Sequence, residues 1–168
     1  MDENNVQLVA CIPRLRRYAR ALAGNRAEAD DLVQDTMERA WSRLASWRRG
    51  SDMRAWLFGI MHNLWIDQAR KRTMVTEAWD EHIPEPTTVS AYPAHLDVRD
   101  LEAALRLLPS EQREILLLVA LEEMTYEEIA STLRIPPGTV MSRLARGRER
   151  LRALMEGRPV ASPLKAVK

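Results

Sequence analysis

Hydrophobic residues recur at helical spacing through most of the first 72 residues and predict three helices there. The first extends from Val6 to Leu22 and ends at Gly24, because glycine commonly follows the last turn of a helix. Asn25, followed three residues later by Glu28, is a capping-box pattern. A second helix should therefore begin there and continue to about residue 45. A third is expected over residues 53–72.

The second and third of these helices each separate into an apolar face and a polar face. The second turns one set of side chains toward a core: Leu32, Val33, Thr36, Met37 and Ala40. Its opposite face carries Asp31, Gln34, Asp35 and Glu38. The apolar stripe of the third consists of Leu57, Ile60, Met61 and Leu64, and a different face projects Trp56, Asn63, Asp67 and Arg70. The third helix ends in the basic residues Arg70, Lys71 and Arg72.

Two stretches lack this periodicity. Residues 47–53 contain the turn-forming residues Gly50, Ser51 and Asp52 and should form a loop. Residues 73–98 contain three prolines and five acidic residues but no Lys or Arg, and we expect a flexible acidic linker there.

Helical spacing resumes after the linker. One helix should cover residues 101–108 and stop at Pro109, and Ser110 is placed to cap the next, over residues 111–121. Thr125 with Glu128 forms a capping box for a short helix that ends near residue 133. After a turn at residues 135–138, Thr139 should cap a basic helix that continues to about residue 155. The fold class is therefore all-α, with two small helical domains at residues 1–72 and 99–157 and a tail at 158–168.

The last two helices have the spacing of a helix-turn-helix. In the second of them Val140, Leu144 and Leu151 form an anchoring stripe. Another side projects Thr139, Ser142, Arg143, Arg146 and Arg150. Arginine suits a helix that enters the major groove, because its planar fork can bind a phosphate or the edge of guanine. The alternative is a solvated basic face on an ordinary helix.

The composition and the absence of certain motifs limit which classes of function are expected. Leu, Ala, Arg and Glu dominate and the aromatic content is 5%, which favours helices over strands. The single cysteine, Cys11, excludes an intrachain disulfide. Neither a signal peptide nor an apolar run long enough for a membrane span is visible. We therefore expect a cytoplasmic protein without membrane insertion. No nucleophile–base pair, glycine-rich phosphate loop or cluster of metal ligands is present. An enzyme, a cofactor and a metal site are therefore not expected.

Four segments resemble one family of bacterial proteins, the extracytoplasmic-function (ECF) sigma factors of RNA polymerase. Residues 136–148, PPGTVMSRLARGR, resemble the family's C-terminal pattern of roughly Pro-x-Gly-Thr-Val-x-Ser-Arg-Leu-x-Arg-Ala-Arg. Residues 107–114 resemble the entry to the C-terminal domain. Residues 29–36, ADDLVQDT, resemble the polymerase-binding segment, and residues 56–67, WLFGIMHNLWID, the promoter-melting segment. The matches occur in the family's order and cover about residues 6–155.

The resemblance implies a transcription-initiation factor whose catalytic partner is the polymerase. Residues 1–72 would be sigma region 2, which binds the polymerase clamp coiled coil and recognises and melts the minus-10 element. Residues 99–157 would be sigma region 4, which reads the minus-35 element and touches the polymerase flap. The resemblance further implies promoter DNA as a ligand and an anti-sigma factor as an inhibitor that covers both domains in a compact arrangement.

The same resemblance assigns roles to individual positions. The polymerase clamp would be bound by Asp31, Gln34, Asp35 and Glu38. The minus-10 element would be contacted by Gly50, Ser51, Asp52, Trp56, Asn63, Asp67, Arg70 and Lys71, with Trp47 and Trp56 as candidate walls of a pocket for a flipped base. The minus-35 element would be read by Thr139, Ser142, Arg143, Arg146 and Arg150.

Three residues depart from the family pattern, and two other functions stay open. Met141 and Ala145 stand where some members place a basic and an aromatic residue, so Arg143 and Arg146 would carry more of the minus-35 readout. His62 is unusual in its segment, and no role is assigned to it or to Cys11. A sigma-like mimic that sequesters an anti-sigma factor would lack the arginine column, and a plain helix-turn-helix regulator would lack the N-terminal matches.

Overall fold

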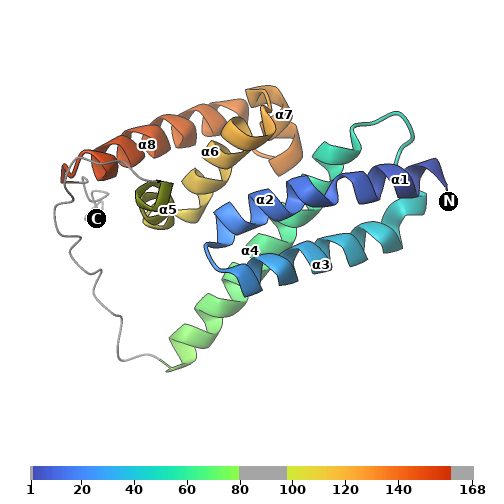
Figure 1. The fold of residues 1–168 in the computed structure, drawn as a ribbon, viewed down its shortest axis with the longest axis horizontal. Helices are drawn as coiled ribbons and strands as arrows, with labels where there is room; N and C mark the ends of the chain where they lie inside the picture. The colour runs from blue at the N-terminus through green and yellow to red at the C-terminus, as the bar shows by residue number, and fades with distance from the viewer. Residues whose placement is uncertain (1, 80–97, 160–168) are drawn as a thin grey trace.

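The structure, a computed structural model, describes residues 2–79 and 98–159, which are helical throughout apart from short turns (Figure 1). The N-terminal unit consists of α1 (Glu3–Ala10), α2 (Ile12–Ala23), α3 (Arg26–Arg43), a short 3-10 turn at Leu44–Ser46, and α4 (Met53–Trp79). The C-terminal unit consists of α5 (Val98–Arg106), α6 (Ser110–Glu122), α7 (Tyr126–Leu133) and α8 (Pro137–Met155). The expected all-α fold with two helical domains is confirmed.

The N-terminal unit is built on the apolar faces that the sequence predicts. α2 packs against α3, and α3 against α4. The predicted stripes of α3 and α4 are buried apart from Met37, which packs against the core half-buried. Asn25 caps α3, because its side chain accepts hydrogen bonds from the backbone N–H groups of Ala27 (2.9 Å) and Glu28 (3.3 Å). The Glu28 side chain instead forms an ion pair with Arg72 at 3.4 Å.

Two helix boundaries in this unit differ from the expectation. The single helix expected from Val6 to Leu22 is broken at Cys11 into α1 and α2, because Pro13 has no backbone N–H to donate to the preceding turn. Helix α4 ends at Trp79 rather than at Arg72, so the first seven residues of the expected linker are helical. No glycine or proline interrupts those seven residues, and their sequence therefore allows the helix to continue. The rest of the expected linker, residues 80–97, and the end of the expected tail, residues 160–168, lie outside the described residues.

The C-terminal unit contains the expected helix-turn-helix, α7 and α8. Val140 and Leu144 are buried and anchor α8 to α6 and α7. Thr125 and Glu128 form the complete capping box of α7. The other two expected caps are wrong, because α6 begins at Ser110 itself and α8 begins at Pro137, two residues before Thr139. Proline fits the first helical position because the missing N–H would have no partner there.

The two units lie against each other and share one hydrophobic core (Figure 1). Helix α2 contacts α6, and α4 contacts α7. Helix α4 approaches α7 closely at Gly59, since a Cβ added there would lie 3.3 Å from the Thr132 carbonyl oxygen, a tighter contact than most Cβ atoms make. We call this packing of α2 and α4 against α5–α7 the closed arrangement.

Because only one of the two expected threonine caps exists, their removal should have unequal effects. Thr125→Ala removes the acceptor for the Glu128 N–H and should lower the free energy of unfolding by about 1 kcal/mol. Thr139→Ala is the matched control and should lower the free energy of unfolding by at most about 0.5 kcal/mol, because the Thr139 side chain caps no helix. Urea unfolding followed by circular dichroism measures both, and equal losses would contradict the assignment of the caps.

Candidate polymerase and nucleic-acid interfaces

The acidic face of α3 is solvent-exposed, as the helical projection predicts. Asp31, Gln34, Asp35 and Glu38 are all exposed. The Gln34 amide donates to the Glu38 carboxylate at 3.2 Å, and the Gln68 amide of α4 donates to Asp35 at 3.3 Å. Most carboxylate oxygens on this face thus remain open to water, as a surface that binds a charged partner requires.

The predicted DNA-reading side of α8, which we call the basic column, is only partly exposed to solvent. It consists of Thr139, Ser142, Arg143, Arg146 and Arg150. Ser142 and Arg146 are exposed, whereas Thr139, Arg143 and Arg150 are half-buried. Arg143 forms an ion pair with Glu111 of α6 at 3.0 Å. Met141 has half of its surface exposed beside this column, so an apolar side chain stands where some family members place a basic one.

The expected minus-10 loop, residues 47–53, is closed by local hydrogen bonds. Gly50 adopts a φ of 86°, which favours glycine, and the Ser51 hydroxyl donates to the Arg48 carbonyl at 2.6 Å. Asp52 accepts a hydrogen bond from the Ala55 N–H at 3.3 Å, at the start of α4. Trp47 is buried and contributes to the core, which argues against its role as an accessible pocket wall, whereas Trp56 is half-buried at the core's edge.

One groove contains residues expected to serve two different DNA elements. Its α4 side includes Asn63, Asp67 and Arg70, and its opposite side includes Glu111 and Arg143. The first three are exposed, and Asp67 and Arg70 form no ion pair with each other in the described part of the chain. The closed arrangement therefore brings the expected minus-10 and minus-35 surfaces face to face.

Polar side chains that sequence reasoning did not assign bridge the two units. His62 of α4 lies with Nδ1 2.6 Å from a carboxylate oxygen of Glu114, and both are buried. The Trp65 indole donates to the Ser110 hydroxyl at 2.7 Å. The sequence hints at this bridge only through a histidine in an apolar segment and a glutamate among the apolar residues of α6. Neither residue indicates from the sequence which side chain it contacts.

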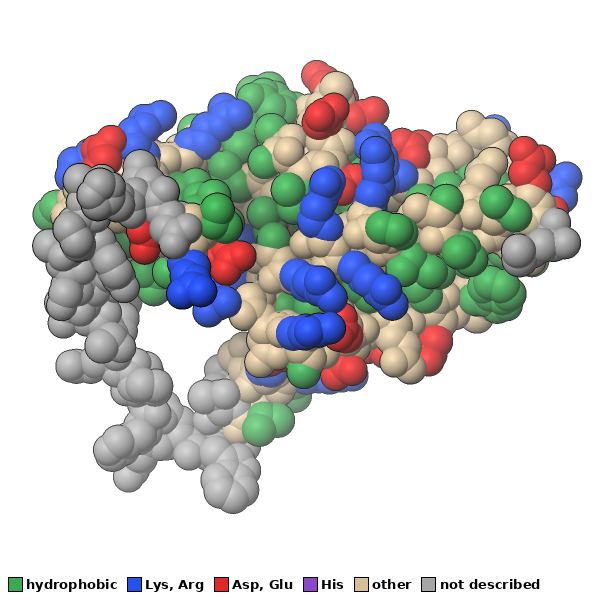
Figure 2. Space-filling model, in the orientation of Figure 1, with side chains coloured by type: hydrophobic (Ala, Val, Ile, Leu, Met, Phe, Trp, Pro, Cys, Tyr) green, Lys and Arg blue, Asp and Glu red, His purple; other side chains and the backbone are tan. Residues whose placement is uncertain are grey.

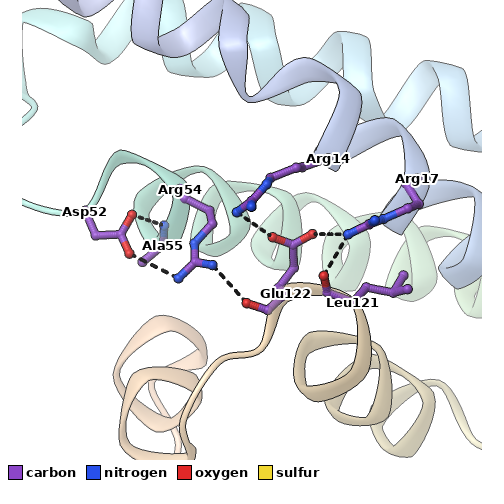
Figure 3. Close-up of polar contacts among 7 residues, drawn as sticks. All are labelled: Arg14, Arg17, Asp52, Arg54, Ala55, Leu121 and Glu122. Atoms are coloured by element: carbon purple, nitrogen blue, oxygen red, sulfur yellow. Dashed lines mark hydrogen bonds and ion pairs between the residues drawn. The ribbon is translucent and has the colours of Figure 1, made fainter.

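A second polar bridge centres on Glu122, the last residue of α6 (Figure 3). Its side chain has no exposed surface, and it lies near Arg14 (3.6 Å) and Arg17 (3.4 Å) of α2. Arg17 also donates to the Leu121 carbonyl at 2.7 Å, and Arg54 of α4 donates to the Glu122 carbonyl at 2.8 Å. The end of α6 is thus held by cations from two helices of the N-terminal unit.

Burial changes the acid–base behaviour of two residues at this boundary. It raises the pKa of the Tyr18 hydroxyl well above its ordinary value, and the carboxylates of Glu114 and Glu122 raise it further. It also lowers the pKa of Arg113, with a smaller contribution from the nearby charge of Arg106. The Arg113 guanidinium donates to the Leu22 carbonyl at 2.6 Å and so attaches the α5–α6 corner to the end of α2.

In the described part of the chain, none of the helices is both long and apolar enough to cross a bilayer. Among the same residues, no group of three or more His, Cys, Asp or Glu side chains is placed to hold a metal ion.

Comparison with known proteins assigns both units. Residues 8–62 match the family model described as the sigma2 domain of PhyR, and residues 99–151 match sigma-70 region 4. The chain is 40% identical to the ECF RNA polymerase sigma factor EcfG of Rhodopseudomonas palustris, over 92% of this chain and 86% of the relative.

Solved structures agree with this assignment. The sigma factor RpoE of Bartonella quintana, in complex with the anti-sigma factor NepR, has a TM-score of 0.77 and 35% identity, with coverage of 90% of this chain and 96% of that one. The anti-anti-sigma factor PhyR of the same organism, also bound to NepR, shares the fold at a TM-score of 0.60 with 18% identity, over 88% of this chain and 48% of that one. From the near full-length match to EcfG and the two matched domains, the chain belongs to the family of ECF RNA polymerase sigma factors.

Proposed function

We propose that this chain binds core RNA polymerase through the acidic face of α3 and directs it to promoters with two recognised elements. Asn63, Asp67 and Arg70 of α4, together with the loop at residues 47–53, contact the minus-10 element. The exposed side of α8 reads the minus-35 element. The observation that carries the proposal is the 40% identity to a sigma factor over nearly the whole chain, combined with an exposed Arg146 on the second helix of a helix-turn-helix. The polymerase catalyses RNA synthesis. The protein acts where the bacterial polymerase acts, which is the cytoplasm.

The closed arrangement cannot read both elements at once. Elements named for positions 35 and 10 are about 25 base pairs apart, which is about 85 Å at 3.4 Å per base pair. Helices of the two units are in direct contact here, so the units must separate on promoter DNA. A protein that stabilises the closed arrangement would hold the factor inactive, and an anti-sigma factor is the partner of this kind that the similar RpoE complex contains.

A sigma mimic is the competing function, because the N-terminal family model is that of PhyR. Two observations favour the sigma factor. The identity is 40% to EcfG and 18% to the PhyR structure. In addition, the basic column of α8 is retained, although a protein that only sequesters an anti-sigma factor has no use for it.

Reconstitution tests the function directly. Core polymerase with this protein should start transcription from a specific set of promoters, and the absence of any specific transcript would contradict the proposal. The Asp31→Ala/Asp35→Ala variant should bind core polymerase about fivefold or more weakly, a loss of about 1 kcal/mol. Glu3→Ala, which removes an exposed carboxylate from α1, is the control and should bind as the wild type does.

The readout by α8 has its own matched pair of variants. Arg146→Ala should weaken minus-35 binding by roughly 1–3 kcal/mol and relax sequence preference at one position. Arg148→Ala removes the same charge from the opposite side of α8 and should change neither affinity nor preference appreciably. Binding of holoenzyme to promoter fragments with single substitutions measures both, and an unchanged preference in Arg146→Ala would remove that residue from the reading surface.

A further inference from the structure

Three arginines from two helices of the N-terminal unit converge on the end of α6 (Figure 3). Arg14 and Arg17 point from α2 toward the Glu122 carboxylate, and Arg54 reaches the Glu122 carbonyl from the first turn of α4. We call Arg14, Arg17 and Arg54 the arginine cluster. It is a concentrated cationic site, and in the closed arrangement the C-terminal unit supplies its anion.

Glu122 is an imperfect partner for this cluster. Its side chain is fully buried, but Oε2 has no hydrogen-bond partner among the described residues, because Arg14 is 3.6 Å away. A buried carboxylate with an unsatisfied oxygen carries a desolvation penalty that its ion pairs only partly offset. The side chains of Arg14 and Arg17 are 54% and 56% exposed, so they lose little hydration in this contact. The geometry therefore favours a contact that can exchange for a better anion.

The cluster lies directly beside the expected minus-10 loop. Arg54 approaches Asp52 of that loop at 3.5 Å while it holds Glu122. The loop also exposes Arg48 and Arg49. On the face of the molecule that Figure 2 shows, Lys and Arg side chains gather over α2. A strand held by the minus-10 loop would lie close to Arg54, and arginine forks match phosphate oxygens as well as they match carboxylates.

We propose that the arginine cluster is a binding site for the phosphate backbone of promoter DNA next to the minus-10 element, and that Glu122 occupies it in the closed arrangement. The proposal rests on the function proposed above. Phosphates and the end of α6 then compete for the same guanidinium groups. Binding of the minus-10 strand removes the attachment of the C-terminal unit, and that unit becomes free to reach the minus-35 element.

The salt dependence of promoter binding by the holoenzyme tests the site. Each phosphate contact contributes about 0.7 to 0.9 to the slope of log K against log salt. Arg14→Ala/Arg17→Ala should therefore reduce the magnitude of that slope by about 1.4 to 1.8. Arg16→Ala/Arg20→Ala removes two exposed charges from α2 that form no ion pair with Glu122 in the described part of the chain, and should change the slope much less. An unchanged slope in the first variant, or equal changes in both, would overturn the proposal.

Competition is tested with Glu122→Gln, which keeps the side chain's size but removes its charge. The free protein should then bind a minus-10 single strand at least about threefold more tightly than the wild type does. Adding Arg14→Ala/Arg17→Ala should abolish that gain. Thermal unfolding checks that the variants fold, and an unchanged affinity in folded Glu122→Gln contradicts the competition.

The sigma function and the phosphate site can be tested separately. If wild-type holoenzyme transcribes specifically but the Arg14→Ala/Arg17→Ala slope is unchanged, the sigma function stands and the phosphate site is wrong. If no specific transcript forms with the wild type, the function itself is wrong.

Discussion

When α6 packs against α2 and α4, the carboxylates of Glu114 and Glu122 leave water, and the closed arrangement depends on how they are compensated. Glu114 is compensated by one short contact with His62. Glu122 is compensated by two partly exposed guanidinium groups at ion-pair distance. Buried ion pairs contribute little net stability but cost much when one partner is lost. They suit an interface that must be specific and must also open.

Under the proposed function, the same side chains serve two arrangements. In the closed arrangement Arg143 pairs with Glu111, and the groove beside them contains Asn63, Asp67 and Arg70. On a promoter these groups would have to separate, because their DNA elements lie far apart along the duplex. The acidic face of α3 differs, since it is exposed even when the units are closed. The proposed polymerase-binding face is therefore accessible before the units separate.

Local patterns in the sequence predicted most of the local structure. The apolar stripes of α3 and α4, the capping box at Thr125 and the helix-turn-helix depend on neighbours within one or two turns, and all are present. The break at Cys11 was also readable from Pro13 and was missed. Contacts between the units could not be predicted, because Glu122 and Arg14 are separated by more than a hundred residues and each alone resembles an ordinary surface charge.

The distance between the units tests the central claim, that this sigma factor is closed when free and opens on its promoter. In a Cys11→Ala background, paired probes at residue 20 of α2 and residue 102 of α5, which line one groove between the units, would report that distance by energy transfer. The free protein should give a short distance, and core polymerase with promoter DNA should lengthen it toward the span of the two elements, about 85 Å. A distance that stays short in an actively transcribing complex would contradict the account.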